Sequence, residues 1–113
     1  MNKTHKNCIE FHKNQLEEKY NYKCRRELDL ARQGNIHKLD LGCFEKIKPP
    51  IAMEVESTKN FQNPQVKSNA EDLKEFKRIY PNAKTYHITT DQVIDFDKEL
   101  NFKSRFKPII GKP

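Results

Sequence analysis

Three acidic side chains in the middle of the chain have the types and the spacing needed to bind a hard cation. Glu54 and Glu56 stand two residues apart in the segment IAMEVESTK, and Asp40 precedes them in HKLDLGC. Carboxylate oxygens are the ligands that Mg²⁺ takes in proteins. Like charges that face each other on a sheet are destabilising, so a cluster of three requires a cation, raised pKa values or full solvation.

The residues around the two glutamates predict a short strand. Apolar side chains at positions 51, 53 and 55 alternate with Ala52, Glu54 and Glu56, and a period of two is typical of a half-buried strand. The apolar set would face the core, and both carboxylates would lie on the other face. Pro49 and Pro50 mark the start of this strand.

The residues around Asp40 predict a second strand that forms a hairpin with the first. Its core face would hold Leu39, Leu41 and Cys43. One allowed register sets Leu41 opposite Met53 and Asp40 opposite Glu54, and the next sets Asp40 opposite Glu56. In either register the three carboxylates gather on one polar face.

A third strand, predicted over residues 22–31, extends this sheet. A Gln-Gly turn signal follows it, and with those two residues at the centre of the turn Glu27 falls opposite Asp40. Glu27 is therefore a supporting candidate for the acidic row. In the alternative interpretation Asp29 faces Lys38, and this face carries ordinary ion pairs worth little.

Helices and one more strand complete the predicted fold. Apolar stripes indicate a helix over residues 7–20 and a second helix that begins near residue 64 or 68 and ends at Tyr80. Residues 83–89 read as a strand parallel to the one with the glutamates, because a helix separates the two. Thr90 and Asp91 are suited to cap a further short helix.

Composition limits the classes of protein and of partner. A chain of 113 residues suits one compact domain, predicted over 1–113 with a basic tail from about residue 98. The formal net charge of +6 makes nucleic acid the expected large anionic partner, although a lysine-rich composition alone locates no patch. No apolar run approaches about 18 residues, so no membrane span is expected.

The cysteines and one histidine are predicted to be structural. Cys8, Cys24 and Cys43 form no C-x-x-C pair, which argues against a zinc knuckle. Their odd number favours a reducing, cytoplasmic setting in which Cys24 and Cys43 are small core residues. His12 lies on the apolar stripe of the first helix and is predicted to be a core-edge residue.

The order helix, three-stranded meander, helix, strand, with Asp40 on the second strand and Glu54-x-Glu56 on the third, resembles the PD-(D/E)XK nuclease superfamily. That superfamily has the restriction-endonuclease-like fold and includes the archaeal Holliday-junction resolvases. The resemblance covers roughly residues 7–90. It implies an α/β (α+β) fold of αβββαβ order, with a mixed central sheet flanked by helices.

The resemblance also implies roles for individual residues. Asp40 and Glu54 would bind Mg²⁺ or Mn²⁺, and Glu56 stands where the superfamily usually has Lys, as in some restriction enzymes. The Pro that usually precedes the Asp is missing. The displaced positive charge would come from Lys59 or Lys67. Gln65 resembles the helix-borne Gln that some members place near the site; in the alternative interpretation Gln65 and Lys67 are surface residues.

The expected activity is metal-dependent hydrolysis of DNA phosphodiester bonds by an endonuclease that uses Asp40, Glu54 and Glu56, with Lys59 as a further catalytic candidate. A homodimer is plausible because cutting both strands needs two sites. Two alternatives stay open. One is a non-catalytic nucleic-acid-binding module on the same fold, and the other is a small α/β interaction protein.

Overall fold

The computed structural model describes residues 3–57 and 60–100. Their helices and strands follow the predicted order. The elements are α1 (Lys3–Lys19), β1 (Lys23–Arg32), β2 (Asn35–Phe44), β3 (Ile51–Glu56), α2 (Pro64–Ile79), β4 (Lys84–Thr89) and α3 (Phe96–Leu100). None of the helices in these ranges is both long enough and apolar enough to cross a bilayer.

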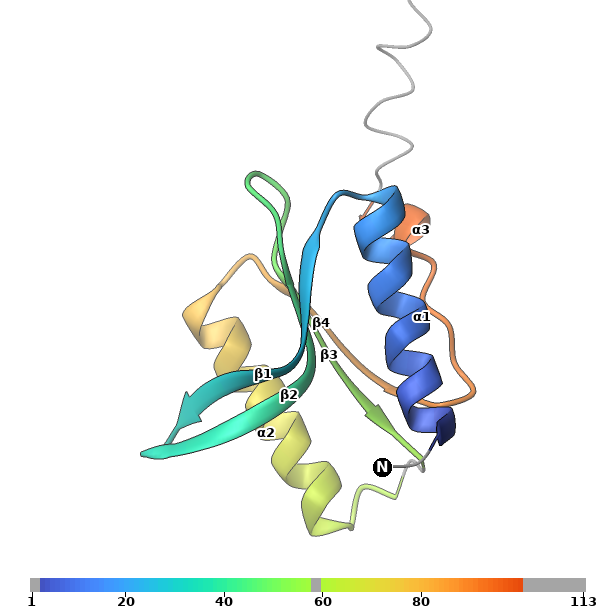
Figure 1. The fold of residues 1–113 in the computed structure, drawn as a ribbon. Helices are drawn as coiled ribbons and strands as arrows, with labels where there is room; N and C mark the ends of the chain where they lie inside the picture. The colour runs from blue at the N-terminus through green and yellow to red at the C-terminus, as the bar shows by residue number, and fades with distance from the viewer. Residues whose placement is uncertain (1–2, 58–59, 101–113) are drawn as a thin grey trace, which may run out of the picture.

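The four strands form one mixed sheet in the order β1-β2-β3-β4. The first two pairings are antiparallel, and β3 pairs with β4 in parallel, as predicted. Helices α1 and α3 lie on one side of the sheet and α2 lies on the other (Figure 1). The mixed α/β architecture with helices on both faces is thereby confirmed.

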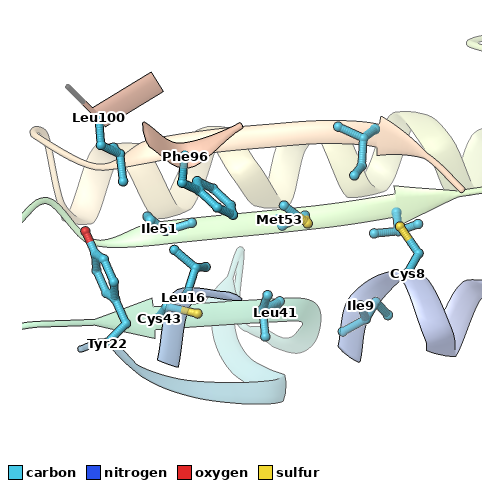
Figure 2. Close-up of a cluster of buried hydrophobic side chains, with 12 residues drawn as sticks. Cys8, Ile9, Leu16, Tyr22, Leu41, Cys43, Ile51, Met53, Phe96 and Leu100 are labelled. Carbon is cyan, nitrogen blue, oxygen red and sulfur yellow. The ribbon is translucent and has the colours of Figure 1, made fainter. Parts of the chain in front are cut away.

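Strand β3 lies inside the sheet and is buried on both faces. Its odd-numbered residues, from Ile51 to Val55, pack in the core beneath α1 and α3 (Figure 2). Ala52 packs on the other face, against Leu73 and Phe76 of α2. The prediction of a half-buried strand is therefore wrong. Helix α2 covers the face that was expected to meet water, and Glu54 is buried with it.

The β1–β2 hairpin bends at Glu27, between the pairs Arg26–Leu41 and Leu28–Leu39. Leu41 belongs to the core under α1, whereas Leu39 belongs to the core under α2, so the prediction that the two leucines share a face is wrong. Glu27 has a φ of 53°, and regular pairs flank it on both sides. This left-handed residue turns the outer part of the hairpin, residues 28–39, toward α2 (Figure 1). We call that part the hairpin arm.

Gly42 leaves room for the Leu28 side chain of β1 at the base of the arm. A Cβ atom at position 42 would lie 2.3 Å from Leu28 Cδ2. We expect Gly42→Ala to lower the free energy of unfolding by about 1–3 kcal/mol because the core must shift to make room. Urea denaturation measures this change. Leu28→Ala removes the clash, so the costs of the two substitutions should fall short of additivity in the double variant; full additivity would contradict the steric explanation.

Two connections follow the predicted turn and cap residues, whereas the predicted cap at Thr90 and Asp91 is wrong because α3 begins only at Phe96. Gln33 and Gly34 have φ values of 52° and 79°, which are the paired positive angles of a tight hairpin turn. Asn63 caps α2 by accepting a hydrogen bond from the Gln65 amide, and Pro64 occupies the first turn. Of the two predicted starts for α2, the earlier one is correct.

His12 is structural, as predicted. It is fully buried, its Nδ1–H donates to the Cys8 carbonyl oxygen at 2.8 Å, and its Nε2 accepts from the Ile94 amide at 3.1 Å. Burial lowers the pKa of this imidazole. The neutral ring thereby joins α1 to the segment that leads into α3.

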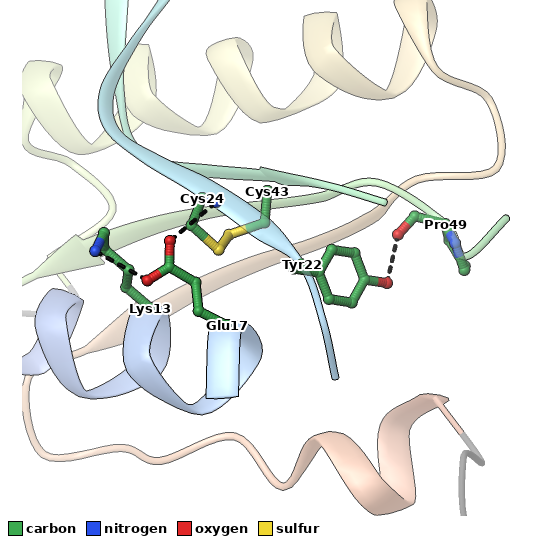
Figure 3. Close-up of a disulfide and its surroundings, with 6 residues drawn as sticks. All are labelled: Lys13, Glu17, Tyr22, Cys24, Cys43 and Pro49. Carbon is green, nitrogen blue, oxygen red and sulfur yellow. Dashed lines mark hydrogen bonds and ion pairs between the residues drawn. A yellow bond between two sulfur atoms is a disulfide. The ribbon is translucent and has the colours of Figure 1, made fainter. Parts of the chain in front are cut away.

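Cys24 and Cys43 form a disulfide between directly paired residues of β1 and β2 (Figure 3). The expectation of two separate core thiols is wrong, because the antiparallel register sets their Cα atoms 4.0 Å apart. Glu17 of α1 accepts a hydrogen bond from the Cys24 amide at 3.3 Å, which attaches this end of the sheet to the helix. Cys8 is a free, buried thiol.

Candidate active site

Asp40 and Glu54 meet where β2 and β3 stop pairing. The register sets Leu41 opposite Met53, as in the first of the two predicted registers, and the backbone pairing ends there. Beyond it, the Asp40 amide donates to Glu54 Oε1 at 2.8 Å, and the Val55 amide donates to Asp40 Oδ2 at 2.8 Å. The two carboxyl groups therefore replace carbonyl groups as acceptors between the diverging strands.

Glu56 joins the same end of β3 and is held by two neighbours. Asn69 of α2 donates its Nδ2–H to Glu56 Oε2 at 2.6 Å, and His87 Nε2 of β4 lies 2.8 Å from the same oxygen. The Glu56 side chain is only 13% exposed. Asp40, Glu54 and Glu56, which we call the carboxylate cluster, thus lie where β2, β3, β4 and α2 come together.

His5 of α1 reaches the cluster from the opposite face of the sheet. Its Nε2 lies 2.7 Å from the Val55 carbonyl oxygen and 3.3 Å from Asp40 Oδ2. A carbonyl oxygen only accepts, so the hydrogen-bond network assigns the proton to Nε2. The same N–H faces the Asp40 carboxylate and compensates part of its charge. Nothing in the sequence pattern signalled this contact.

Burial gives Glu54 unusual acid–base properties. The side chain is 1% exposed, and its Oε2 atom is buried without a hydrogen-bond partner among the described residues. Burial is the largest cause that raises the pKa of Glu54, to about 9, and the neighbouring Asp40 carboxylate is the next. Without a cation, Glu54 is therefore protonated at neutral pH. A buried polar group without a hydrogen-bond partner costs about 1–3 kcal/mol.

Asp40 is affected by the same surroundings. Burial raises the pKa of Asp40, against the opposing effects of the Val55 amide, of His5 and of the Glu54 carboxyl. Two adjacent buried acids with raised pKa values are typical of functional sites. Their burial does not stabilise the fold, so another role has to explain it.

The donor set fits a hard divalent cation, although the side chains are not already gathered around one. Protein donors hold one oxygen of each carboxylate, namely Asp40 Oδ2, Glu54 Oε1 and Glu56 Oε2. The second oxygen of each is left as a candidate ligand, and for Glu54 it is the unpartnered Oε2. Within residues 3–57 and 60–100, no three His, Cys, Asp or Glu side chains form a ready-made metal site. Binding would require the side chains to rotate toward a common point.

The other predicted site residues fall into three groups. Gln65 donates to Asn69 Oδ1 at 2.9 Å, and so it supports the residue that holds Glu56. Lys67 is exposed on α2, and none of the cluster's hydrogen bonds or ion pairs given above involves it. Glu27 is exposed and does not extend the acidic row, because the bend of β1 turns it away. Lys59, like most of the basic tail, lies outside the described residues.

A second buried acid lies beside the cluster. Asp72 of α2 is 2% exposed, and its Oδ1 accepts from Arg32 Nε at 2.6 Å. His37 Nδ1 lies 3.2 Å from the same oxygen, and Arg32 also donates to Ser68 Oγ at 3.1 Å. These contacts fasten the hairpin arm to α2. In the sequence, Arg32 looked like a turn residue, and no signal paired it with a position 40 residues away.

Comparison of the chain with protein-family models, with curated proteins and with solved structures finds no match in any of the three. The assignment of a function therefore rests on the chemistry of the carboxylate cluster and its neighbours.

Proposed function

We propose that this protein is a metal-dependent endonuclease that hydrolyses DNA phosphodiester bonds at the carboxylate cluster. The observation that carries the proposal is the burial of Glu54 beside Asp40, with one Glu54 oxygen left without a partner. A divalent cation would bind that oxygen and would offset the electrostatic cost of burying the two carboxylates. The chain's resemblance to the PD-(D/E)XK superfamily and the αβββαβ order of its elements support the same function.

The residues present assign roles within such a site. Asp40 and Glu54 would hold Mg²⁺ or Mn²⁺. When bound, the ion neutralises charge at the phosphate and makes a nearby water more acidic. Glu56 is the candidate general base, because Asn69 and His87 fix one of its oxygens and leave the other to accept a proton.

The chemical step is a hydrolysis. The oxygen of a water molecule attacks phosphorus, one P–O ester bond breaks, and the proton of the water passes to Glu56. The leaving oxygen takes a proton from solvent. Glu56 replaces the Lys that is usual in the superfamily, so Lys59 and Lys67 are the proposed sources of positive charge toward the phosphate.

The experiment that tests the proposal is incubation of the purified protein with supercoiled plasmid and with branched DNA, in Mg²⁺, in Mn²⁺ and in EDTA. We expect nicking in either metal and none in EDTA. Asp29→Asn, which alters a 66% exposed carboxylate of β1, is the matched control for variants of the cluster and should cleave normally. Absence of cleavage with every substrate and metal would refute the proposal.

The residues that hold Glu56 provide a separate prediction. His87→Leu removes a hydrogen-bond donor from Glu56 and should lower kcat by about 10–100-fold, the usual effect of losing a group that orients a site residue. His87→Gln keeps an N–H donor at a similar distance and should recover most of that loss. Gel-based initial rates measure both variants. Equal rates for the two variants would show that loss of the hydrogen bond to Glu56 does not cause the fall in kcat.

One observation favours a second function. The carboxylates already satisfy their neighbours' amides and do not surround a common point. This suits a nucleic-acid-binding module without catalysis. Such a module would bind DNA in EDTA, would cleave it in neither metal, and would keep its affinity in Asp40→Asn.

A further inference from the structure

An open pocket lies between α2 and β4, beside the carboxylate cluster. Its volume is about 350 Å³, within the range of ligand-binding sites. The lining residues are Ala70, Leu73, Lys74 and Lys77 of α2 and Thr85 and His87 of β4. His87 is also the residue that contacts Glu56. The pocket therefore adjoins the proposed catalytic centre, and we call it the α2–β4 pocket.

The charge of the α2–β4 pocket is positive. Lys74 and Lys77 are one helical turn apart on α2, and the described lining residues include no acidic side chain. Lys74 pairs with Glu71 at 3.0 Å, but the Lys74 side chain is 77% exposed, so a competing anion can replace that contact at little cost. Lys77 donates to the Ala83 carbonyl oxygen at 2.6 Å, which holds its ammonium group near β4.

The position of β4 in the sheet leaves this side of the molecule open. Strand β4 is the last strand of the order, so its outer edge has no strand partner among the described residues. Helix α2 covers the face of the sheet that adjoins this edge (Figure 1). The pocket is open to solvent rather than enclosed, so an extended strand can enter it from the surface.

We infer that the α2–β4 pocket binds the sugar–phosphate backbone of the nucleic-acid strand that is cut, with Lys74 and Lys77 each contacting a phosphate. The inference deepens the proposed function and rests on it for the identity of the ligand. Backbone contacts of this kind position a strand without reading its sequence. The pocket would hold phosphates next to the one that reaches the carboxylate cluster.

The test measures binding without cleavage. Affinity for a fluorescent 30-nucleotide single strand and for the corresponding duplex is measured in EDTA over a range of salt concentrations. Each lost phosphate contact lowers the slope of log K against log[salt] by about 0.9 for duplex and about 0.7 for single strands. Lys74→Gln/Lys77→Gln should therefore lower the slope by roughly 1.4–1.8. The matched control, Lys19→Gln/Lys46→Gln, alters two exposed lysines that do not line the pocket. It should leave the salt slope unchanged.

A gain-of-charge variant makes the test independent of any folding defect. Thr85→Lys adds a cation to the pocket lining and should raise both the affinity and the salt slope, by close to one phosphate contact. The inference is wrong if wild type binds nucleic acid but neither Lys74→Gln/Lys77→Gln nor Thr85→Lys changes the salt slope. This holds even if the protein cleaves DNA. A slope that changes as expected in a protein that never cleaves would leave the pocket assignment standing and refute the nuclease.

Two other outcomes also overturn the inference. Wild-type protein that fails to bind either nucleic acid at low salt has no backbone site in this pocket. If light scattering finds a dimer that Thr85→Lys dissociates while nucleic-acid affinity stays constant, the pocket is a contact between two copies of this chain.

Discussion

Glu54→Gln is expected to make the metal-free protein more stable while it abolishes DNA cleavage. Glutamine has the shape of the protonated glutamic acid that burial favours, so it can still accept from the Asp40 amide. It cannot supply a carboxylate to a cation, and cleavage should fall at least about 100-fold. Thermal unfolding in EDTA and initial rates of plasmid nicking measure the two effects. A loss of stability together with the loss of cleavage would show that Glu54 serves the fold.

The stability gain should depend on pH in a defined direction. The pKa of Glu54 is raised to about 9 in the folded state, whereas the pKa of an ordinary glutamate is 4.5. The stability that this group contributes is therefore fully present below pH 4.5 and is lost as the pH rises toward 9. The advantage of Glu54→Gln over wild type should be near zero at pH 4.5 and on the order of 3 kcal/mol at pH 7.

DNA binding separates the catalytic effect from the stability effect. We expect Glu54→Gln to bind DNA in EDTA about as tightly as wild type, since the change removes no positive charge. Asp29→Asn should leave binding and cleavage unchanged and should affect stability only slightly, because that carboxylate is exposed. If Glu54→Gln also lost its DNA affinity, the absence of cleavage would no longer report on chemistry.

Arg32→Ala is expected to lower the free energy of unfolding by about 3 kcal/mol or more, because it leaves the Asp72 carboxylate buried without its main partner. For a domain of this size the loss corresponds to a fall in Tm of roughly 10–20 °C. Differential scanning calorimetry measures it. Asp72 is also among the charges that raise the pKa of Glu54, so the loss of Arg32 should disturb the carboxylate cluster as well.

Two comparisons test the cause of that loss. Lys38→Ala removes an ion pair with Asp29 on the same hairpin, but both side chains are more than half exposed, so the loss of stability should be small. Combining Arg32→Met with Asp72→Leu removes both charges and should recover much of the stability. If Arg32→Ala and Lys38→Ala lowered the free energy of unfolding equally, the burial of Asp72 would not be the cause of the loss.

Most of the local structure could be predicted from the sequence, because short-range physics decides it. Alternating apolar residues mark β2 and β3, Asn63 and Pro64 mark the start of α2, and the Gln-Gly pair marks the hairpin turn. Turn length and side-chain alternation together limit the strand register to two choices. The meeting of Asp40 with Glu54 follows from the register that the fold adopts.

The errors arose where distant parts of the chain meet. The sequence offers no sign that α2 buries the second face of β3, and so the strand was predicted to be only half-buried. The left-handed Glu27 bends the hairpin, which moves Leu39 to the other core and turns Glu27 away from Asp40. The disulfide depends on the β1–β2 register, which places Cys24 directly opposite Cys43.

The sequence by itself thus determined the order of helices and strands and the chemical nature of the acidic residues, since both depend on neighbours within a few positions. Only the tertiary structure decided how deeply those acids are buried and which groups hold them. His5, Asn69 and His87 come from α1, α2 and β4, and each reaches the end of β3 from a different element. Burial and charge compensation depend on packing across the sheet, which no local pattern encodes.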